Sequence, residues 1–242
     1  AVAKGGMVDG IRRAMDEGLV RRTGFTSHDS VENIVTYVKE ADWCDIILLS
    51  YNLLNRSYAP ALAAAHAQGI GTIVMNPVGG GRLGVDSPVL KKLAGEVGAA
   101  SVAELAIRYI LSNPSVTTLI SGVGKVSDVD STVAAASKPA FSAAQMAAIE
   151  GFLDGLARDK VGFCTGCKYC MPCPQGIDIP TVMGCIYDDR YWGFVDVARE
   201  RYRHMDTAKA SACTACGQCE KKCTQHLSIS TEMVYAASAY GE

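Results

Sequence analysis

The sequence predicts an α/β fold in its first part, with about four parallel strands and their helices, followed by a small, mostly helical and cysteine-rich domain. Two observations support this prediction. Segments with helical spacing alternate with short apolar runs over residues 1–140, and eight of the 10 cysteines fall in two short runs after residue 160. Regular alternation of helix and strand is typical of a parallel sheet covered by helices.

A helix and a short strand open the chain. Met7, Ile11 and Met15 recur at the spacing of one helix face, which predicts a helix over residues 7–17. After a short connection, residues 22–26 are expected to be extended and to form the first strand. Connections of this length are normal between such elements.

The second unit of helix and strand contains the clearest strand. Asp29 or Ser30 is placed to cap a helix over residues 30–39, because short side chains with oxygen accept hydrogen bonds from the first helical turn. Residues 45–50 form a nearly continuous apolar run, Asp-Ile-Ile-Leu-Leu-Ser. Such a run predicts a strand that is buried on both faces.

Two more units complete the alternation. Ser101 and Glu104 form a capping-box pattern at the start of one helix, and Pro114 marks its end. The remaining helices and strands are expected at residues 59–68, 71–75, 101–112, 116–121 and 127–136.

The composition excludes several classes of protein. Hydrophobic residues make up 49% and charged residues 20% of the chain, which is typical of a globular protein. A formal net charge of -2 argues against binding to nucleic acid or to a membrane surface through bulk charge. No apolar run is long enough to span a bilayer, and no signal-peptide pattern is present, so we expect a cytoplasmic protein. Because the first residue is Ala1, we expect a processed chain, a trimmed chain or a fragment.

A change in composition predicts the domain limits. Residues 1–140 are expected to form the α/β part, and residues 160–242 the cysteine-rich domain. Residues 141–159 are expected to form a bridging helix, because Ser142 and Gln145 make a second capping-box pattern.

A mostly helical segment is expected between the two cysteine runs, over residues 179–205, with room for an interruption at residues 191–193. Four basic residues gather near its end: Arg199, Arg201, Arg203 and His204. We interpret them as a solvated helix face, and the alternative is a docking patch for an acidic redox partner.

The two cysteine runs predict metal chemistry. The first has the spacing C-x2-C-x2-C-x2-C-P and consists of Cys164, Cys167, Cys170 and Cys173. The second has the spacing C-x2-C-x2-C-x3-C and consists of Cys213, Cys216, Cys219 and Cys223. Without a secretory signal, these cysteines are expected to be reduced thiols. Three cysteines at consecutive x2 spacing suit one iron–sulfide cube, and a fourth from elsewhere closes it, so we expect two [4Fe–4S] clusters.

Two alternatives remain open for the cysteines. Structural zinc sites use pairs of C-x2–4-C hooks, but four cysteines within such a short segment, twice, suit a cube better than two hooks. Disulfides or bare thiols are the second alternative. The two cysteines outside the runs, Cys44 and Cys185, are expected to pack as small apolar residues.

The two runs resemble those of a bacterial two-cluster ferredoxin, in which the fourth cysteine of each run binds the cluster of the other run. The resemblance implies that one cluster is held by Cys164, Cys167, Cys170 and Cys223. It implies that the second is held by Cys213, Cys216, Cys219 and Cys173. The sequence departs from the family in the x2 spacing before Cys173, where x3 is usual, and in Thr224, where Pro is usual.

Several segments of the first part are similar to the aldo/keto reductase family. Residues 17–28 resemble the pattern G-K-I-R-x-I-G-x-S, and residues 68–83 resemble G-I-x-V-x-x-x-P-L-x-x-G-x-L. Further similar segments are residues 46–52, 105–111 and 116–122. Their order, together with the cysteine-rich tail, resembles the C-terminal part of iron–sulfur-containing aldo/keto reductases.

This resemblance implies a fold and a limit on catalysis. The family folds as an eight-stranded (β/α)8 TIM barrel, so the four strands would be strands five to eight, the C-terminal half of the barrel. The family's catalytic Asp, Tyr, Lys and His all come from the first half, so the resemblance places no catalytic residue in this chain. Tyr51 and His66 are expected to be structural, and the chain alone is expected to be inactive.

The resemblance also implies part of a nicotinamide-cofactor site at the carboxyl ends of the strands. A carboxamide-binding pair would lie after the first strand, a pyrophosphate loop after the third, and a phosphate region after the fourth. The residues implied are Thr26, Ser27, Asn76, Pro77, Gly79, Ser121 and Gly122. Met75 stands where the family often stacks an aromatic ring, and Ser131-Thr132 replace the Glu-Asn pair near the adenine, so selectivity for NADP is not supported.

The expected function is that of an iron–sulfur oxidoreductase that couples nicotinamide-dependent carbonyl or alcohol chemistry to electron transfer. A hydride carries two electrons and each cluster passes one, so two clusters suit a relay. The expected partners are a ferredoxin or a flavoprotein and, in a longer parent protein, NAD(P)H and a small carbonyl or alcohol substrate. The alternative is a stand-alone ferredoxin-like carrier whose α/β part is a docking scaffold, and a purely structural role for the clusters is a third option.

Overall fold

The structure is a computed structural model that describes residues 6–85, 87–158, 164, 168–223 and 227–241. The chain divides into two compact units. The first comprises Ala1–Gly84 and Val97–Ala148, and the second comprises Val85–Glu96 and Ile149–Glu242.

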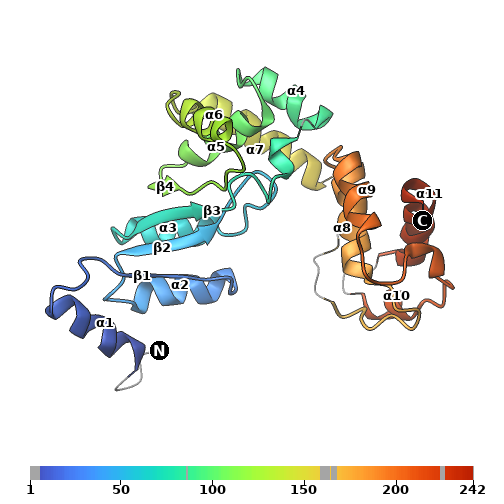
Figure 1. Cartoon of the computed structure of the whole chain (residues 1–242), viewed down its shortest axis with the longest axis horizontal. Helices are drawn as coiled ribbons and strands as arrows, with labels where there is room; N and C mark the ends of the chain where they lie inside the picture. The colour runs from blue at the N-terminus through green and yellow to red at the C-terminus, as the bar shows by residue number, and fades with distance from the viewer. Residues whose placement is uncertain (1–5, 86, 159–163, 165–167, 224–226, 242) are drawn as a thin grey trace. The chain divides into compact units, whose positions relative to one another are not determined.

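The first unit is built on a four-stranded parallel sheet in the order β1-β2-β3-β4 (Figure 1). The strands are β1 (Gly24–Thr26), β2 (Ile46–Ser50), β3 (Gly71–Met75) and β4 (Thr118–Leu119). All neighbouring strands pair in parallel. The four strands expected from the sequence are therefore confirmed, although β4 is shorter than residues 116–121.

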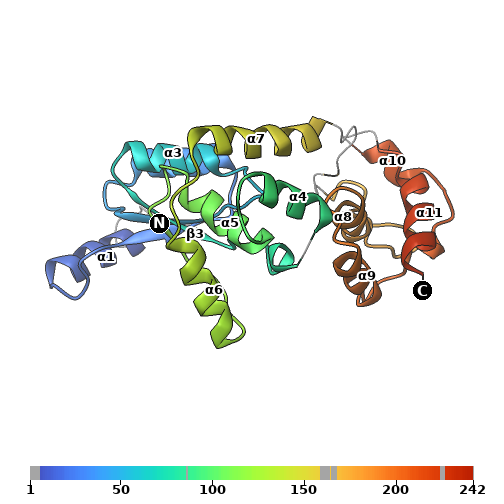
Figure 2. The same cartoon turned by 90° about the horizontal axis from the view of Figure 1, so that it is seen from above.

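The expected helices of this unit also form (Figures 1 and 2). They are α1 (Met7–Asp16), α2 (Val31–Glu40), α3 (Ala59–Ala67), α5 (Val102–Leu111) and α6 (Val126–Ala136), with a short 3-10 helix, η1 (Arg82–Gly84), after β3. Helix α2 contacts α3, and α3 lies against β3. The cap expected at the start of α2 is present, because the Ser30 hydroxyl accepts a hydrogen bond from the Asn33 N–H at 3.2 Å.

One face of the sheet is buried more deeply than the other. In β2, Ile47 and Leu49 are 0% exposed, whereas Ile46 and Leu48 are half-buried. Strand β3 alternates in the same way. Burial on both faces is therefore a wrong expectation for the described part of the chain. The physical reason is that alternating burial arises where only one face of a strand meets a complete layer.

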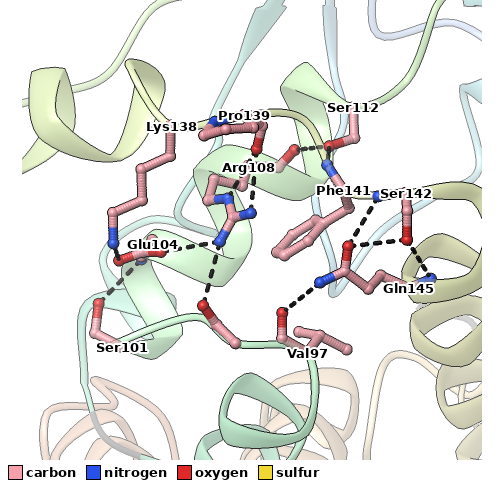
Figure 3. Close-up of polar contacts among 11 residues, drawn as sticks. Val97, Ser101, Glu104, Arg108, Ser112, Lys138, Pro139, Phe141, Ser142 and Gln145 are labelled. Atoms are coloured by element: carbon pink, nitrogen blue, oxygen red, sulfur yellow. Dashed lines mark hydrogen bonds and ion pairs between the residues drawn. The ribbon is translucent and has the colours of Figure 1, made fainter.

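A buried ion pair on α5 organises the helical layer (Figure 3). The Arg108 guanidinium donates to the Glu104 carboxylate at 3.1 Å, and Lys138 donates to the other oxygen of that carboxylate at 2.8 Å. Only 9% of Arg108 and 8% of Glu104 is exposed. Burial alone would raise the pKa of Glu104, but the hydrogen bonds from Lys138 and Arg108 hold it below its ordinary value. The pair therefore contributes stability at neutral pH that is lost as the pH falls through this lowered pKa.

The same guanidinium joins three segments of the chain. Its other N–H groups donate to the Pro139 carbonyl at 3.1 and 3.3 Å and to the Gly98 carbonyl at 3.4 Å. The guanidinium also lies 4.0 Å from the centre of the Phe141 ring, a cation–π geometry. Arg108 thus ties α5 to the loop before it and to the connection after α6 (Figure 3).

Helix α7 (Ala143–Arg158) starts with the expected capping box. The Ser142 N–H donates to the Gln145 side-chain oxygen at 2.9 Å, and the Gln145 N–H donates back to the Ser142 hydroxyl at 3.3 Å. The Gln145 amide also donates to the Val97 carbonyl at 2.9 Å, which fixes the start of α7 against the loop before α5.

The second unit is helical in its described part. Its helices are α4 (Pro88–Glu96), α8 (Ile179–Arg190), α9 (Val195–Arg203), α10 (Gln218–Lys222) and α11 (Ile229–Tyr240), with a short 3-10 helix, η2 (Ala210–Ala212), and the later part of α7. The interruption near residues 191–193 is confirmed, and Gly193 there adopts a positive φ of 68°. Helices α8, α9 and α11 contact one another around an apolar core that includes Val182, Ile186, Tyr202, Met233 and Ala236.

Helix α4 is absent from the elements expected from the sequence. Ser87 caps it by accepting a hydrogen bond from the Leu90 N–H at 3.2 Å, and the same hydroxyl donates to the Trp192 carbonyl. The Ser-Pro pair at residues 87–88 is the local signal, because proline is favoured in the first helical turn after a serine cap.

We expect Arg108→Leu to lower the free energy of unfolding of the chain by about 3 kcal/mol, because it removes one of the two cations that pair with the buried Glu104 carboxylate and leaves only Lys138. The matched control is Arg12→Leu, which removes an exposed ion pair with Asp42 at 3.0 Å and is expected to cost less than about 1 kcal/mol. Urea unfolding followed by circular dichroism measures both. Equal losses in the two variants would contradict a structural role for the buried pair.

Candidate functional site

Four cysteines from the two runs line one cavity in the second unit. The cavity is small, with a volume of about 20 Å³, and part of it is open to solvent. The cysteines on its wall are Cys173, Cys213, Cys216 and Cys219. Ile177, Ile179, Ile229 and Met233 add apolar side chains to the lining. The structure therefore brings together the four residues that the ferredoxin resemblance assigns to the second cluster.

Two residues in the left-handed backbone conformation lie within the second cysteine run, beside this cavity. Ala215 has a φ of 52° and Gly217 a φ of 68°. Glycine adopts this conformation freely, but alanine does so at a cost of about 1–2 kcal/mol. A strained residue between two cysteines is typical of a segment whose shape is set by the group it binds.

Cys173 reaches the cavity from the other run because two segments are joined beside it. Residues Ile177 and Ala208 form a parallel β-bridge, so the segment after Cys173 lies next to the segment before Cys213. A turn closed by the Gly176 N–H and the Cys173 carbonyl at 3.0 Å fixes the approach. This pairing explains how residues far apart in sequence face the same space.

A zinc ion and an iron–sulfide cube place different demands on the cysteines of this cavity. Within the described residues, no group of three or more His, Cys, Asp or Glu side chains is placed to hold one metal ion. A zinc ion would require four ligand atoms at about 2.0–2.3 Å from one point, whereas a cube is bound at its corners. Burial raises the pKa of the Cys219 thiol, so binding of iron must release a proton there.

The cysteines assigned to the first cluster are only partly described. Cys167 lies outside the described residues. Cys170 is 9% exposed and belongs to the apolar core, and Cys164 and Cys223 pack against that same core. Cys173, Cys213 and Cys219 pack against the same core, so cysteines of both assigned sets lie around it.

Tyr187 is a residue that the sequence analysis missed. Its hydroxyl accepts a hydrogen bond from the Cys164 N–H at 2.7 Å, and only 7% of its surface is exposed. Burial raises the pKa of Tyr187 to about 12, so the hydroxyl stays neutral at physiological pH. Its aromatic character on a helix predicts only a core residue, and no local signal marks its contact with Cys164.

The cysteines outside the runs have the predicted packing role. Cys185 is 0% and Cys44 is 9% exposed, and burial raises the pKa of the Cys44 thiol. Every described cysteine is a free thiol.

The loops assigned to a nicotinamide cofactor follow the carboxyl ends of the strands, which share one edge of a parallel sheet. After β1, the Thr26 hydroxyl donates to the Leu48 carbonyl at 3.1 Å, and the Ser27 hydroxyl accepts from the Asp29 N–H at 3.1 Å. After β4, Ser121 is half-buried and Gly122 is exposed.

The loop after β3 is held by its own side chains. Asn76 has a φ of 58°, and its side-chain oxygen accepts from the Gly80 N–H at 2.5 Å. The buried Asn52, which the sequence analysis did not select, donates to the Asn76 carbonyl at 2.8 Å. Pro77 and Gly79 are buried, and a Cβ at Gly79 would lie 3.0 Å from the Leu54 side chain. These contacts give the glycine-rich turn a fixed shape.

Two residues set aside as structural have different surroundings. Tyr51 is buried, and its hydroxyl donates to that of Tyr109 at 2.8 Å with the rings stacked. His66 is exposed in the last turn of α3. Tyr51 thus has the structural role expected of it, and no packing role is evident for His66 in the described chain.

The basic segment of α9 is largely a solvated helix face. Arg201 pairs with Asp188 at 3.4 Å, and Arg203 pairs with Glu200. His204 also lies 3.2 Å from Glu200. Local carboxylates therefore offset most of this positive charge. None of the helices in the described residues is long and apolar enough to cross a membrane.

Comparisons with known proteins agree with this division of the chain. A model of the aldo/keto reductase family matches residues 7–154, and a model of a 4Fe-4S dicluster domain matches residues 163–228. No curated protein matches the sequence.

Solved structures of aldo-keto reductases share the fold. Holo AKR11C1 from Bacillus halodurans has a TM-score of 0.52 and 22% identity, over 61% of this chain and 58% of that one. The apo form of that enzyme has the same TM-score of 0.52 and 22% identity, over 60% and 55%. The thermostable aldo-keto reductase Tm1743, in complex with the inhibitor epalrestat, has a TM-score of 0.50 and 16% identity, over 60% and 53%. The chain therefore spans less than two thirds of these solved relatives.

We expect Tyr187→Phe to lower the free energy of unfolding by about 1 kcal/mol and to speed the loss of iron to a chelator, because the Cys164 N–H loses its acceptor. Tyr169→Phe is the matched control, since Tyr169 is 64% exposed. Urea unfolding and chelator release of the anaerobically prepared protein measure the two effects. Indistinguishable behaviour of the two variants would show that the Tyr187 hydroxyl does not support Cys164.

Proposed function

The chain belongs to the aldo/keto reductase family, and we propose that it couples nicotinamide-dependent carbonyl or alcohol chemistry to electron transfer through two [4Fe–4S] clusters. The combination of this family with a 4Fe-4S dicluster domain supports the assignment of the protein as an iron–sulfur oxidoreductase. The observation that carries the finer proposal is the cavity on which Cys173 meets Cys213, Cys216 and Cys219.

Each cluster is assigned four cysteines from both runs. Cys213, Cys216, Cys219 and Cys173 would hold one, and Cys164, Cys167, Cys170 and Cys223 the other. When bound, such clusters accept and donate single electrons at a potential set by their surroundings. The apolar lining of the cavity would exclude water from its inner side, and Tyr187 would hold the backbone of Cys164 in place.

The α/β part is proposed to be strands five to eight of an eight-stranded barrel in a longer parent protein. The parallel order β1 to β4, the half-buried face of β2 and β3, and the partial coverage of solved relatives support this proposal. A parallel sheet of this kind requires cover on both faces and closed edges. In that parent, the catalytic groups would come from the other half of the barrel.

The loops at the carboxyl edge of the sheet are proposed to contact a nicotinamide cofactor. Thr26 and Ser27 would face the carboxamide, because their hydroxyls both donate and accept hydrogen bonds. The loop with Asn76, Pro77 and Gly79 would approach the pyrophosphate, and its fixed shape would lower the cost of binding. Ser121 and Gly122 would face the phosphate region.

The proposed substrate is a small carbonyl or alcohol compound, and the proposed electron partner is a ferredoxin or flavoprotein in the cytoplasm. The second candidate is a stand-alone electron carrier in which the α/β unit serves as a docking scaffold. If the chain works without the other half of the barrel, the half-buried face of the sheet is the surface on which a partner protein would dock. This observation favours the stand-alone carrier.

We expect the anaerobically reconstituted chain to contain about eight irons and eight sulfides and to give [4Fe–4S] EPR signals after reduction with dithionite. Cys213→Ala is expected to lower the iron content to about four, because one cluster loses a ligand. Cys185→Ala, a buried cysteine outside both runs, is the control and should keep the full content. Zinc without sulfide in the purified protein would overturn the proposal.

A further inference from the structure

Three unpaired cations of the second unit lie in the cysteine segments themselves. Among the described residues, the side chains that form no ion pair or hydrogen bond include those of Lys168, Lys221 and Lys222. Lys221 and Lys222 end α10, between Cys219 and Cys223. They are exposed, so their charge acts on the solvent side of the protein.

Most other cationic side chains of this unit are paired with nearby carboxylates or carbonyl groups. Arg190 pairs with Glu232 at 3.1 Å, and the arginines 201 and 203 of α9 are paired as described above. The Lys209 ammonium donates to the carbonyls of Tyr202 and Met205 at 2.6 and 3.0 Å. Arg199, exposed on α9, is the remaining cation without a partner in the described part of this unit.

Part of the cavity wall is exposed to solvent and belongs to the same cysteine segment as the two lysines. Thr214, Ala215 and Cys216 line the cavity and are exposed. The acidic residue in this segment is Glu220, and its carboxylate accepts hydrogen bonds from the Ser230 hydroxyl and N–H at 2.6 and 2.8 Å. Ser230 is neutral, so Glu220 keeps its negative charge, and the two lysines leave this short segment with a net positive charge.

We propose that Thr214, Ala215, Cys216, Lys221 and Lys222 form a docking face, named here the lysine face, for the acidic surface of a small one-electron carrier protein. The proposal rests on the proposed function of this domain. Opposite charges steer two proteins together and fix their orientation, and the exposed wall at Cys216 lets the redox centre of the carrier approach the cavity. Each transfer moves one electron between the bound cluster and the carrier, and no bond is made or broken. The positive charge that serves docking lies on α10, and not on α9.

The test uses the reconstituted full chain and an acidic plant-type [2Fe–2S] ferredoxin as the probe. Stopped-flow mixing of the reduced ferredoxin with the oxidised chain gives a second-order rate constant at several salt concentrations. For the unmodified chain, we expect this constant to fall steeply with added salt. At low salt, K221E/K222E should lower it by about tenfold or more, because both steering charges are reversed.

Two controls make the result specific. Arg199→Glu reverses a charge on α9 that also has no partner in the described structure. K221E is the matched single change on the lysine face. We expect K221E to lower the second-order rate constant more than Arg199→Glu does. The iron and sulfide content and the EPR spectrum after chemical reduction should be unchanged in all variants, which shows that the clusters themselves are intact. A constant that does not respond to salt or to K221E/K222E would overturn the lysine face, as would an equal or larger loss with Arg199→Glu. Failure to incorporate iron and sulfide would instead overturn the proposed function, and the docking proposal with it.

Discussion

The meeting of the two cysteine segments is the constraint on which the second unit depends. Cys173 and Cys213 must reach one cavity although a helical segment separates them. Helices α8 and α9 pack against each other, so the chain that leaves the first cysteine run comes back to it. The bridge between Ile177 and Ala208 then places the two cysteine segments side by side. The return is secured by the Tyr202 hydroxyl, which accepts a hydrogen bond from the Ala210 N–H at 2.8 Å. Because a bound cluster would link the same segments covalently, metal binding and folding of this unit are expected to be coupled.

The first unit depends on a different kind of contact. There, the buried guanidinium of Arg108 is the common partner of several segments, because it donates hydrogen bonds to backbone carbonyls of two different connections. The sheet beside it remains deeply buried on one face only. The two units thus fix their loops in two ways. In the first unit, the hydrogen bonds of Arg108 hold the loops, and in the second unit, the loops meet at a cavity lined by cysteines.

Much of the local structure follows from short sequence patterns. Spacing and caps located the helices that begin near Ser30 and Ser101 and the helix that follows Ser142, because a cap is a property of adjacent residues. The cysteine spacing, through its resemblance to ferredoxins, also anticipated that Cys173 joins the second run. Tyr187 could not be found in this way, because its partner lies 23 residues earlier and no pattern encodes that contact. The burial expected for residues 45–50 was wrong for a related reason: a strand's composition does not say which neighbouring layers are present.

The position of α4 has a consequence for the modularity of the protein. The segment that contains it, Val85–Glu96, belongs to the second unit, while the chain on both sides belongs to the first, so the polypeptide passes between the units three times. No single cut can then release the cysteine-rich unit whole. A fragment that begins after Ala148 would lack Ser87, whose hydroxyl bonds the Trp192 carbonyl in the turn between α8 and α9. Transplanting the cysteine-rich unit onto another protein would therefore require α4 to be grafted with it, as a separate insertion.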